Sequence, residues 1–416
     1  MSSATLDMTL QNDHKWQGHH SCNNDSVKDW SECKLAASFE CSPTNYWEWQ
    51  LAFRPDRPSS SRTLREELSE HQLGLCVNAM LVVLLSYLLF DDLRNMTGGF
   101  FMLSYPLEGV YGIGPHDLKL VFGFITLFTA ARVAVMDYVL KPLAVELQIL
   151  KPKTQTRFAE QSYMIVYYTV FWSSGLKIFI DHTPADTHGI DALSISLWTD
   201  FPQLRLQATL KLYYLAQLGF WLQQVAVLHL ESRRKDHFQM LLHHVVTIML
   251  LAGSYSYRQW RAGNAILVCM DLVDIILPLA KVLRYAKLQR ACDAAFGVFV
   301  AAWILTRHVL FLAICWSIYE HVHNTTMTYG TYSAATGDLM SLNGNDKIIA
   351  NIFQPFLDPS AESVSFNANI RWSFLGLLLL LQCITIIWFV MIVRVIIRIV
   401  RGEGATDVRS EDEDEE

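Results

Sequence analysis

Apolar residues are grouped along the chain in long blocks, and shorter polar connections separate these blocks. A helix needs roughly 20 mostly apolar residues to cross the hydrocarbon layer of a membrane, and helices of soluble proteins seldom sustain such a stretch. One block is short and another contains two aspartates, so seven spans are an alternative to eight. The pattern predicts an all-α polytopic membrane protein with about eight transmembrane helices, at residues 74–90, 118–140, 159–180, 208–230, 238–257, 264–280, 296–319 and 372–397.

The blocks divide the chain into four parts. Residues 1–72 are polar and lack an apolar stretch, which predicts a partly disordered cytosolic extension and no cleavable signal peptide. Residues 73–156 contain the first spans, and residues 157–402 contain the other six. Residues 403–416 form an acidic tail, which accounts for much of the net charge of -7 and contains Ser410 as a candidate phosphorylation site before a run of acidic residues.

Basic residues indicate how the chain crosses the membrane. Lys and Arg cluster in alternate connections, and by the positive-inside rule these connections and both termini face the cytosol. The two glycosylation sequons, at Asn95 and Asn324, fall in connections on the opposite side and are therefore candidate glycosylation sites. Eight cysteines are scattered without CxxC or metal-ligand spacing, so neither a disulfide framework nor a metal site is expected.

The polar residues with the clearest chemical meaning lie in two consecutive spans. His243 and His244 are near the start of one span, and Asp271 and Asp274 lie within the next. A carboxylate at mid-membrane costs about 2.5–3.5 kcal/mol on insertion scales, so such groups usually pair or line a cavity. The two aspartates are three positions apart and share a helix face, and Thr247 lies four positions after His243 on the face of that histidine. A histidine pair alone also occurs as a structural feature of an interface, but the two carboxylates argue for a shared site.

The residues around this constellation resemble a known family. The run ESRRKDHFQMLLHHVVT from Glu231 to Thr247, followed by MDLVD from Met270 to Asp274, is similar to the longevity-assurance motif of ceramide synthases. The resemblance extends over roughly residues 157–400, the TLC domain, and the acidic tail is similar to that of fungal members. It implies six helices in a TLC-type barrel around a central cavity, with His243 and His244 as the catalytic pair and Asp271 and Asp274 as required residues.

The resemblance also implies a reaction and a location. The activity would be N-acylation of a sphingoid base, sphinganine or phytosphingosine, by acyl-CoA in the endoplasmic reticulum membrane, often by a dimer and in fungi with a small single-span accessory subunit. A thioester is already activated, so no cofactor or metal is needed beyond acyl-CoA as co-substrate. The amine must lose a proton, which suits a histidine tuned by a carboxylate. An imidazole can also attack the thioester directly, and the sequence leaves both roles open.

Several further residues have two interpretations each. Arg233, Arg234 and Lys235 lie about two helical turns before His243, where they are candidates for binding CoA phosphates or simply set the topology. Thr247 is a candidate substrate-binding residue on the histidine face. Other polar groups within spans are expected to pair structurally or to reach the interface, among them Arg132 with Asp137 and Arg307 with His308, and Pro278 is expected to interrupt the helix of the aspartates.

Three other classes of protein were weighed against this interpretation. A di-iron lipid hydroxylase needs several HxxHH boxes, which the fourteen histidines do not form. A transporter would show internal repeats or matching broken helices, which are not evident. A non-catalytic TLC relative, such as a lipid sensor or a translocon-associated protein, would lack the histidine pair with its aspartates, and it is the alternative that stays closest.

Overall fold

A computed structural model describes residues 64–401, apart from Asp186, Arg205, residues 231–235, residues 343–347 and Pro359. The expectations for most of the N-terminal extension, for the basic run Arg233, Arg234 and Lys235, and for Ser410 in the acidic tail lie outside the described residues.

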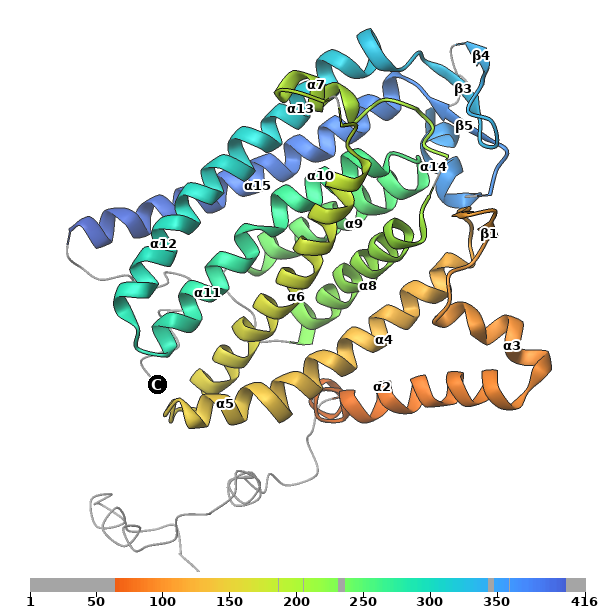
Figure 1. The fold of residues 1–416 in the computed structure, drawn as a ribbon. Helices are drawn as coiled ribbons and strands as arrows, with labels where there is room; N and C mark the ends of the chain where they lie inside the picture. Colours follow the sequence, from red (N-terminus) through yellow and green to blue (C-terminus); the bar gives the residue numbers. More distant parts are fainter. Residues whose placement is uncertain are drawn as a thin grey trace, which may run out of the picture. The chain divides into compact units, whose positions relative to one another are not determined.

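The described chain is predominantly helical, as the apolar blocks predict (Figure 1). The α-helices are α2 (Leu64–Leu89), α3 (Asp91–Thr97), α4 (Asp117–Val135), α5 (Lys141–Glu146), α6 (Pro152–His182), α7 (Ile190–Ser196), α8 (Ala208–Leu230), α9 (His237–Ser256), α10 (Trp260–Asp271), α11 (Val273–Tyr285), α12 (Gln289–Trp303), α13 (Phe311–His321), α14 (Ile348–Leu357) and α15 (Ala368–Val400). Short 3-10 and π-helical segments are η1 (Gly98–Phe100), η2 (Met136–Leu140), η3 (Ile304–Leu310) and η4 (Val322–Thr326). The strands are β1 (Pro106–Leu107), β2 (Val110–Tyr111), β3 (Gly330–Ser333), β4 (Leu339–Leu342) and β5 (Ser363–Phe366).

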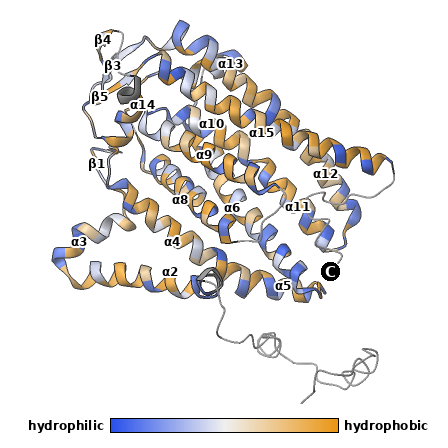
Figure 2. Ribbon diagram, turned by 180° about the vertical axis from the view of Figure 1, so that it is seen from behind, coloured by the Kyte–Doolittle hydropathy of each residue, from blue (hydrophilic) through white to orange (hydrophobic). Residues whose placement is uncertain are grey.

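Within the described residues, six helical stretches are long and apolar enough to cross a membrane. They are Glu70–Leu89, Asp117–Glu146, Pro152–His182, His237–Ser256, Gln289–Thr326 and Ala368–Val400. Apolar residues follow these helices along much of their length (Figure 2). The all-α polytopic class is thereby confirmed.

The other two expected spans are present as helices with a different character. Residues 208–230 form α8, whose Lys211 and three glutamines lower its mean hydropathy. Residues 264–280 lie in α10 and α11, which are separate pieces of 12 and 13 residues. Helix α8 is long enough to span a membrane but not apolar enough, and α10 and α11 are each too short, so the count of eight remains a prediction.

The helices of the predicted six-helix domain pack against one another. Helix α6 contacts α8, α10 and α11, α9 contacts α8, α10 and α15, and α12 packs on α11 (Figure 1). Helix α2 differs, because its apolar stretch is not buried by the described residues and its helix contacts are to α3 and α4. The expected bundle therefore exists, with α2 on its outside.

The helix of the two aspartates breaks between them. Helix α10 ends at Asp271 and α11 begins at Val273, whereas Pro278 lies inside α11. The expected interruption is thus real but its place was wrong, since the break is at Leu272. A proline removes the hydrogen bond to the carbonyl four residues earlier, here that of Asp274, so the helix is weakened on its N-terminal side.

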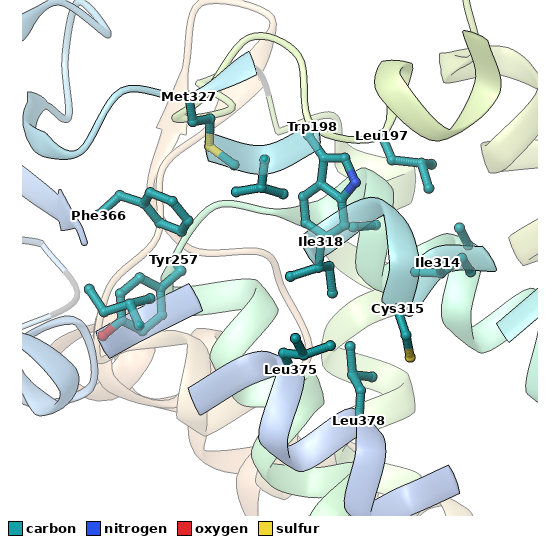
Figure 3. Packing of buried hydrophobic residues seen from close by; sticks show 14 of the residues in the cluster. Leu197, Trp198, Tyr257, Ile314, Cys315, Ile318, Met327, Phe366, Leu375 and Leu378 are labelled. Carbon is teal, nitrogen blue, oxygen red and sulfur yellow. The ribbon is translucent and has the colours of Figure 1, made fainter. Parts of the chain in front are cut away.

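The connection between α13 and α15 folds into a small cap. Strands β3, β4 and β5 form an antiparallel sheet in the order β4-β3-β5. Phe366 of β5 packs with Trp198, Met327 and Ile318 in the apolar core of Figure 3. The Tyr257 hydroxyl donates to the Ile352 carbonyl of α14 at 2.9 Å. Burial raises the pKa of this hydroxyl, so the hydroxyl keeps the proton that it donates to α14.

A buried ion pair joins α4 to α8. Lys211 Nζ lies 2.7 Å from Asp117 Oδ1 and donates to the carbonyls of Ser104 and Gly112, each at 2.8 Å. The other carboxylate oxygen accepts from the Tyr255 hydroxyl of α9 at 2.8 Å and from the Gly114 amide at 3.1 Å. Three oxygen atoms therefore lie within 2.8 Å of the ammonium, and these contacts tie α4, α8, α9 and the preceding loop together.

Both sequons are on the surface. Asn95 lies in α3 and Asn324 in η4, and both side chains are exposed. The side of the membrane they face stays a prediction.

Candidate active site

The two histidines lie buried on α9 between aromatic side chains. His243 and His244 are 8% and 6% exposed, and their ring centroids are 5.8 Å apart. The Trp221 ring of α8 packs edge-to-face on both, at 5.4 and 5.3 Å, and the Trp388 ring of α15 packs on His243 at 5.2 Å. Helices α8, α9 and α15 therefore hold both imidazoles in fixed orientations.

The two imidazoles differ in hydrogen bonding. The Nδ1 atom of His244 lies 2.6 Å from the Met240 carbonyl one turn earlier. A carbonyl only accepts, so Nδ1 carries the proton and Nε2 keeps a lone pair. The Nδ1 atom of His243 is buried and has no partner among the residues that the structure describes. His244 is thus arranged to accept a proton at Nε2, whereas the tautomer of His243 is not fixed.

Asp271 is linked to α8 and α6 through an amide. Its Oδ2 accepts from Gln217 Nε2 at 3.0 Å, and Gln217 Oε1 accepts from the Tyr167 hydroxyl at 3.0 Å. Asp271 is 1% exposed, and its Oδ1 has no hydrogen-bond partner within the described part of the chain. One oxygen of this carboxylate is therefore anchored and the other is unpaired.

Asp274 forms an ion pair with Arg307 of η3. Arg307 Nη2 lies 2.9 Å from Asp274 Oδ2 and also donates to the Met270 carbonyl at 2.8 Å. Arg307, grouped with His308 from the sequence, thus pairs structurally as expected, but its partner is Asp274, and His308 bonds to Gln382.

Asp137 also has a different partner from the expected one. Its Oδ1 lies 2.6 Å from Lys141 Nζ, one helical turn further along the chain. Side chains at i, i+4 are neighbours on a helix surface, so the lysine lies within reach.

The carboxylates lie in the site without touching the imidazoles. Among the described residues, neither aspartate is within hydrogen-bond distance of His243 or His244. The backbone carbonyl of Met240, rather than a carboxylate, fixes the His244 tautomer. The two aspartates contact different neighbours, Gln217 of α8 and Arg307 of η3.

Two cavities meet at this constellation. A narrow cavity of about 60 Å³ is mostly apolar and includes Ile266, Ile318, Phe366, Phe374 and Leu378 in its lining. A wide cavity of about 610 Å³ is more polar and includes Arg132, Glu160, Lys281, Arg284 and Asp293. Both are lined by the same four residues: Trp221, His243, Asp274 and Arg307.

The remaining site residues divide between these cavities. His244 lines the wide cavity, whereas Asp271 and Thr247 line the narrow one. The Thr247 hydroxyl oxygen is buried without a partner in the described residues. Within the same residues, no three His, Cys, Asp or Glu side chains converge as metal ligands would. The structure thus brings together His243, His244, Thr247, Asp271 and Asp274.

The sequence reasoning missed four residues of this site. Gln217 and Arg307 are polar groups within helices of the bundle, and that is the signal that could have pointed to them. Trp221 and Trp388 gave no such signal, because aromatic residues are common in membrane helices.

Comparisons with known proteins agree with these observations. The family model of the TLC domain matches residues 157–394. The chain is 39% identical over 348 residues to the sphingosine N-acyltransferase-like protein ALT7 of Alternaria alternata, covering 83% of this chain and 76% of that protein. It is 38% identical to sphingosine N-acyltransferase lag1 of Schizosaccharomyces pombe, covering 83% and 80%, and 34% identical to ceramide synthase FUM18 of Gibberella moniliformis, covering 80% and 77%.

Proposed function

Because the chain belongs to the TLC-domain family, we propose that it is a ceramide synthase, an acyltransferase that joins a fatty acyl group from acyl-CoA to the amine of a sphingoid base. Its relatives named sphingosine N-acyltransferase or ceramide synthase match it over most of its length. A non-catalytic lipid sensor or translocon companion is not favoured, because those relatives carry enzyme names.

The observation that carries this proposal is the position of His243 where the two cavities meet. The narrow apolar cavity suits the part of a fatty acyl chain next to the thioester, which is stabilised by leaving water. The wide cavity offers both cationic and acidic side chains, which suit the phosphates of CoA and the ammonium of the sphingoid base. A thioester whose chain lies in the first cavity and whose CoA lies in the second has its carbonyl near His243.

The reaction then needs a proton acceptor and a defined order of bonds. His244 Nε2 accepts a proton from the ammonium of the sphingoid base, since Nδ1 is already protonated toward the Met240 carbonyl. The freed amine attacks the thioester carbon beside His243, the carbonyl electron pair moves to oxygen, and a C–N bond forms. The attacking nitrogen loses its extra proton, collapse breaks the C–S bond, and the leaving thiolate takes up a proton, which gives CoA and ceramide.

The aspartates and the tryptophans arrange this chemistry. Asp274, held by Arg307, lines both cavities, and Asp271, held by Gln217, lines the narrow one, so both carboxyl groups lie beside the reacting carbonyl without contacting the imidazoles. Trp221 and Trp388 cover the imidazole rings and keep water from the thioester, so aminolysis is favoured over hydrolysis. Thr247 offers a hydroxyl to the substrate from the next turn of α9.

Location and assembly extend the proposal. We place the enzyme in the endoplasmic reticulum membrane with both termini in the cytosol, acting as a homo- or heterodimer, with a small single-span subunit as a further partner. The basic run Arg233, Arg234 and Lys235 supports CoA binding because it precedes the first turn of α9. Asn95 and Asn324 remain the candidate glycosylation sites and Ser410 the candidate phosphorylation site.

The activity is tested with membranes that contain the chain, long-chain acyl-CoA and sphinganine. We expect ceramide to be formed with an equal amount of free CoA thiol, and both to stop when sphinganine is omitted. Mass spectrometry measures the ceramide, and a thiol reagent measures the CoA. Release of CoA without ceramide would identify a thioesterase, and absence of both products would contradict the proposed acyltransferase.

A further inference from the structure

A buried guanidinium lies where the two cavities meet, and the mechanism above uses it only to hold Asp274. Arg307 is 2% exposed and lines both cavities together with His243. It lies in η3, a π-helical segment between α12 and α13. Such segments are rare and frequently occur at functional sites.

Three neighbours fix the guanidinium. Its Nη2 atom uses its two hydrogens on the Asp274 carboxylate at 2.9 Å and on the Met270 carbonyl at 2.8 Å. The Trp303 ring lies under the guanidinium carbon at 4.7 Å. The Met270 carbonyl lies in the last turn of α10, just before the boundary with α11.

Part of the donor capacity of this guanidinium is left over. A guanidinium has five N–H donors, and the bonds to Asp274 and Met270 account for two of them. The Nε atom is buried and has no hydrogen-bond partner in the part of the chain that the structure describes. An unpaired buried donor destabilises the protein, so its presence beside the imidazoles points to a ligand atom as its partner.

The acyl transfer creates the atom that such a donor fits. When the amine attacks, the carbonyl electron pair moves to oxygen, and this oxyanion persists until the C–S bond breaks. Donors that are fixed before the reaction stabilise that charge without having to reorganise. Asp274 and Met270 fix Arg307, so its donors are in place before the amine attacks.

We propose that Arg307 is a catalytic residue that donates to the thioester oxygen as it becomes an oxyanion. This inference rests on the proposed acyltransferase activity and adds a role to it. Arg307 thus acts twice: Nη2 holds Asp274, and the remaining N–H groups face the reacting carbonyl.

The test compares Arg307→Gln and Arg307→Lys with Arg261→Gln as the matched control. Arg261 also pairs with an aspartate, Asp200 at 3.3 Å, but lines neither cavity. Each purified variant is assayed for kcat and for the KM of acyl-CoA, and its unfolding midpoint is measured. Arg307→Gln should lower kcat about 10²–10³-fold with little change in KM, because a lost oxyanion donor affects the transition state alone.

Two further measurements separate catalysis from structure. Arg307→Lys should recover only part of the loss, because an ammonium lacks the fork that serves Asp274 and the oxyanion together. Added guanidinium ion should partly restore kcat in Arg307→Ala, and equimolar urea, which is uncharged, should not.

The outcomes distinguish this inference from the function beneath it. If the wild type forms ceramide and Arg307→Gln keeps its kcat, the oxyanion role is overturned while the acyltransferase stands. If kcat falls only in proportion to the folded fraction, Arg307 is structural and the inference also fails. If the wild type forms no ceramide, both fall together.

Discussion

Two ion pairs within the described part of the bundle have different surroundings. In the Lys211–Asp117 pair, both side chains are almost fully enclosed, and the ammonium also donates to two backbone carbonyls. In the Arg307–Asp274 pair, the Asp274 side chain is 31% exposed, and Arg307 keeps an unpaired Nε. The first pair joins helices, whereas the second lines both cavities.

This difference distinguishes polar groups that support the fold of the bundle from those that serve the candidate site. Lys211 and Asp117 line neither cavity, so we expect their removal to affect folding rather than substrate binding. The site instead collects unpaired buried atoms, on His243, Thr247, Asp271 and Arg307. Such atoms cost stability in the protein alone, and a substrate that pairs with them recovers that cost.

Lys211→Met should have the largest effect on stability. It leaves the Asp117 carboxylate buried without its cation, which costs about 3–5 kcal/mol. We expect a marked fall in the unfolding midpoint in detergent, with unchanged turnover per folded molecule.

Lys141→Met is the matched control, because its pair with Asp137 is only partly buried. Breaking it should cost under about 1 kcal/mol. Equal losses in the two variants would show that the Lys211 pair has no special structural role.

Gln217→Leu should have the opposite balance of effects from Lys211→Met, because it should lower turnover more than stability. It removes the amide that anchors Asp271 to Tyr167, so the carboxylate loses its fixed position. Turnover per folded molecule should fall at least about tenfold, which corresponds to roughly 1.4 kcal/mol at the transition state.

The control is Gln382→Leu on α15, whose amide bonds to His308 away from both cavities. It removes a similar buried amide and should destabilise the fold to a similar extent with unchanged turnover. If the two glutamine variants lose turnover alike, the link from Gln217 to Asp271 has no catalytic part.

The smallest effects come from removing single hydroxyls. Tyr255→Phe removes one donor to Asp117, and Tyr167→Phe removes one donor to Gln217. Each should cost about 1 kcal/mol of stability. Only Tyr167→Phe should also lower turnover, by a few-fold. A loss of turnover in Tyr255→Phe and not in Tyr167→Phe would contradict the assignment of the first hydroxyl to structure and of the second to catalysis.

Much of the fold and part of the site follow from local features of the sequence. Apolar runs of membrane length predict helices, because a backbone in lipid must satisfy its own hydrogen bonds. Spacing and resemblance together indicate His243, His244, Asp271 and Asp274, and the structure places all four beside the two cavities.

Partners across the bundle could not be predicted in this way. Arg307 lies beside His308 in sequence, but it pairs with Asp274, because side chains of different helices meet only after packing. The break at Leu272 was likewise hidden, since the visible signal was Pro278. No pattern in the long polar connection between the last two spans predicted the small sheet, whose Phe366 lines the narrow cavity.

The central claim is that His243 and His244 perform the acyl transfer at the place where the cavities meet. The most direct measurement is ceramide formed from acyl-CoA and sphinganine per folded molecule of His243→Ala and His244→Ala. We expect both to keep a folded, monodisperse form and to lose at least about 10²-fold in turnover. Ceramide formation at the wild-type rate by both variants would contradict the assignment.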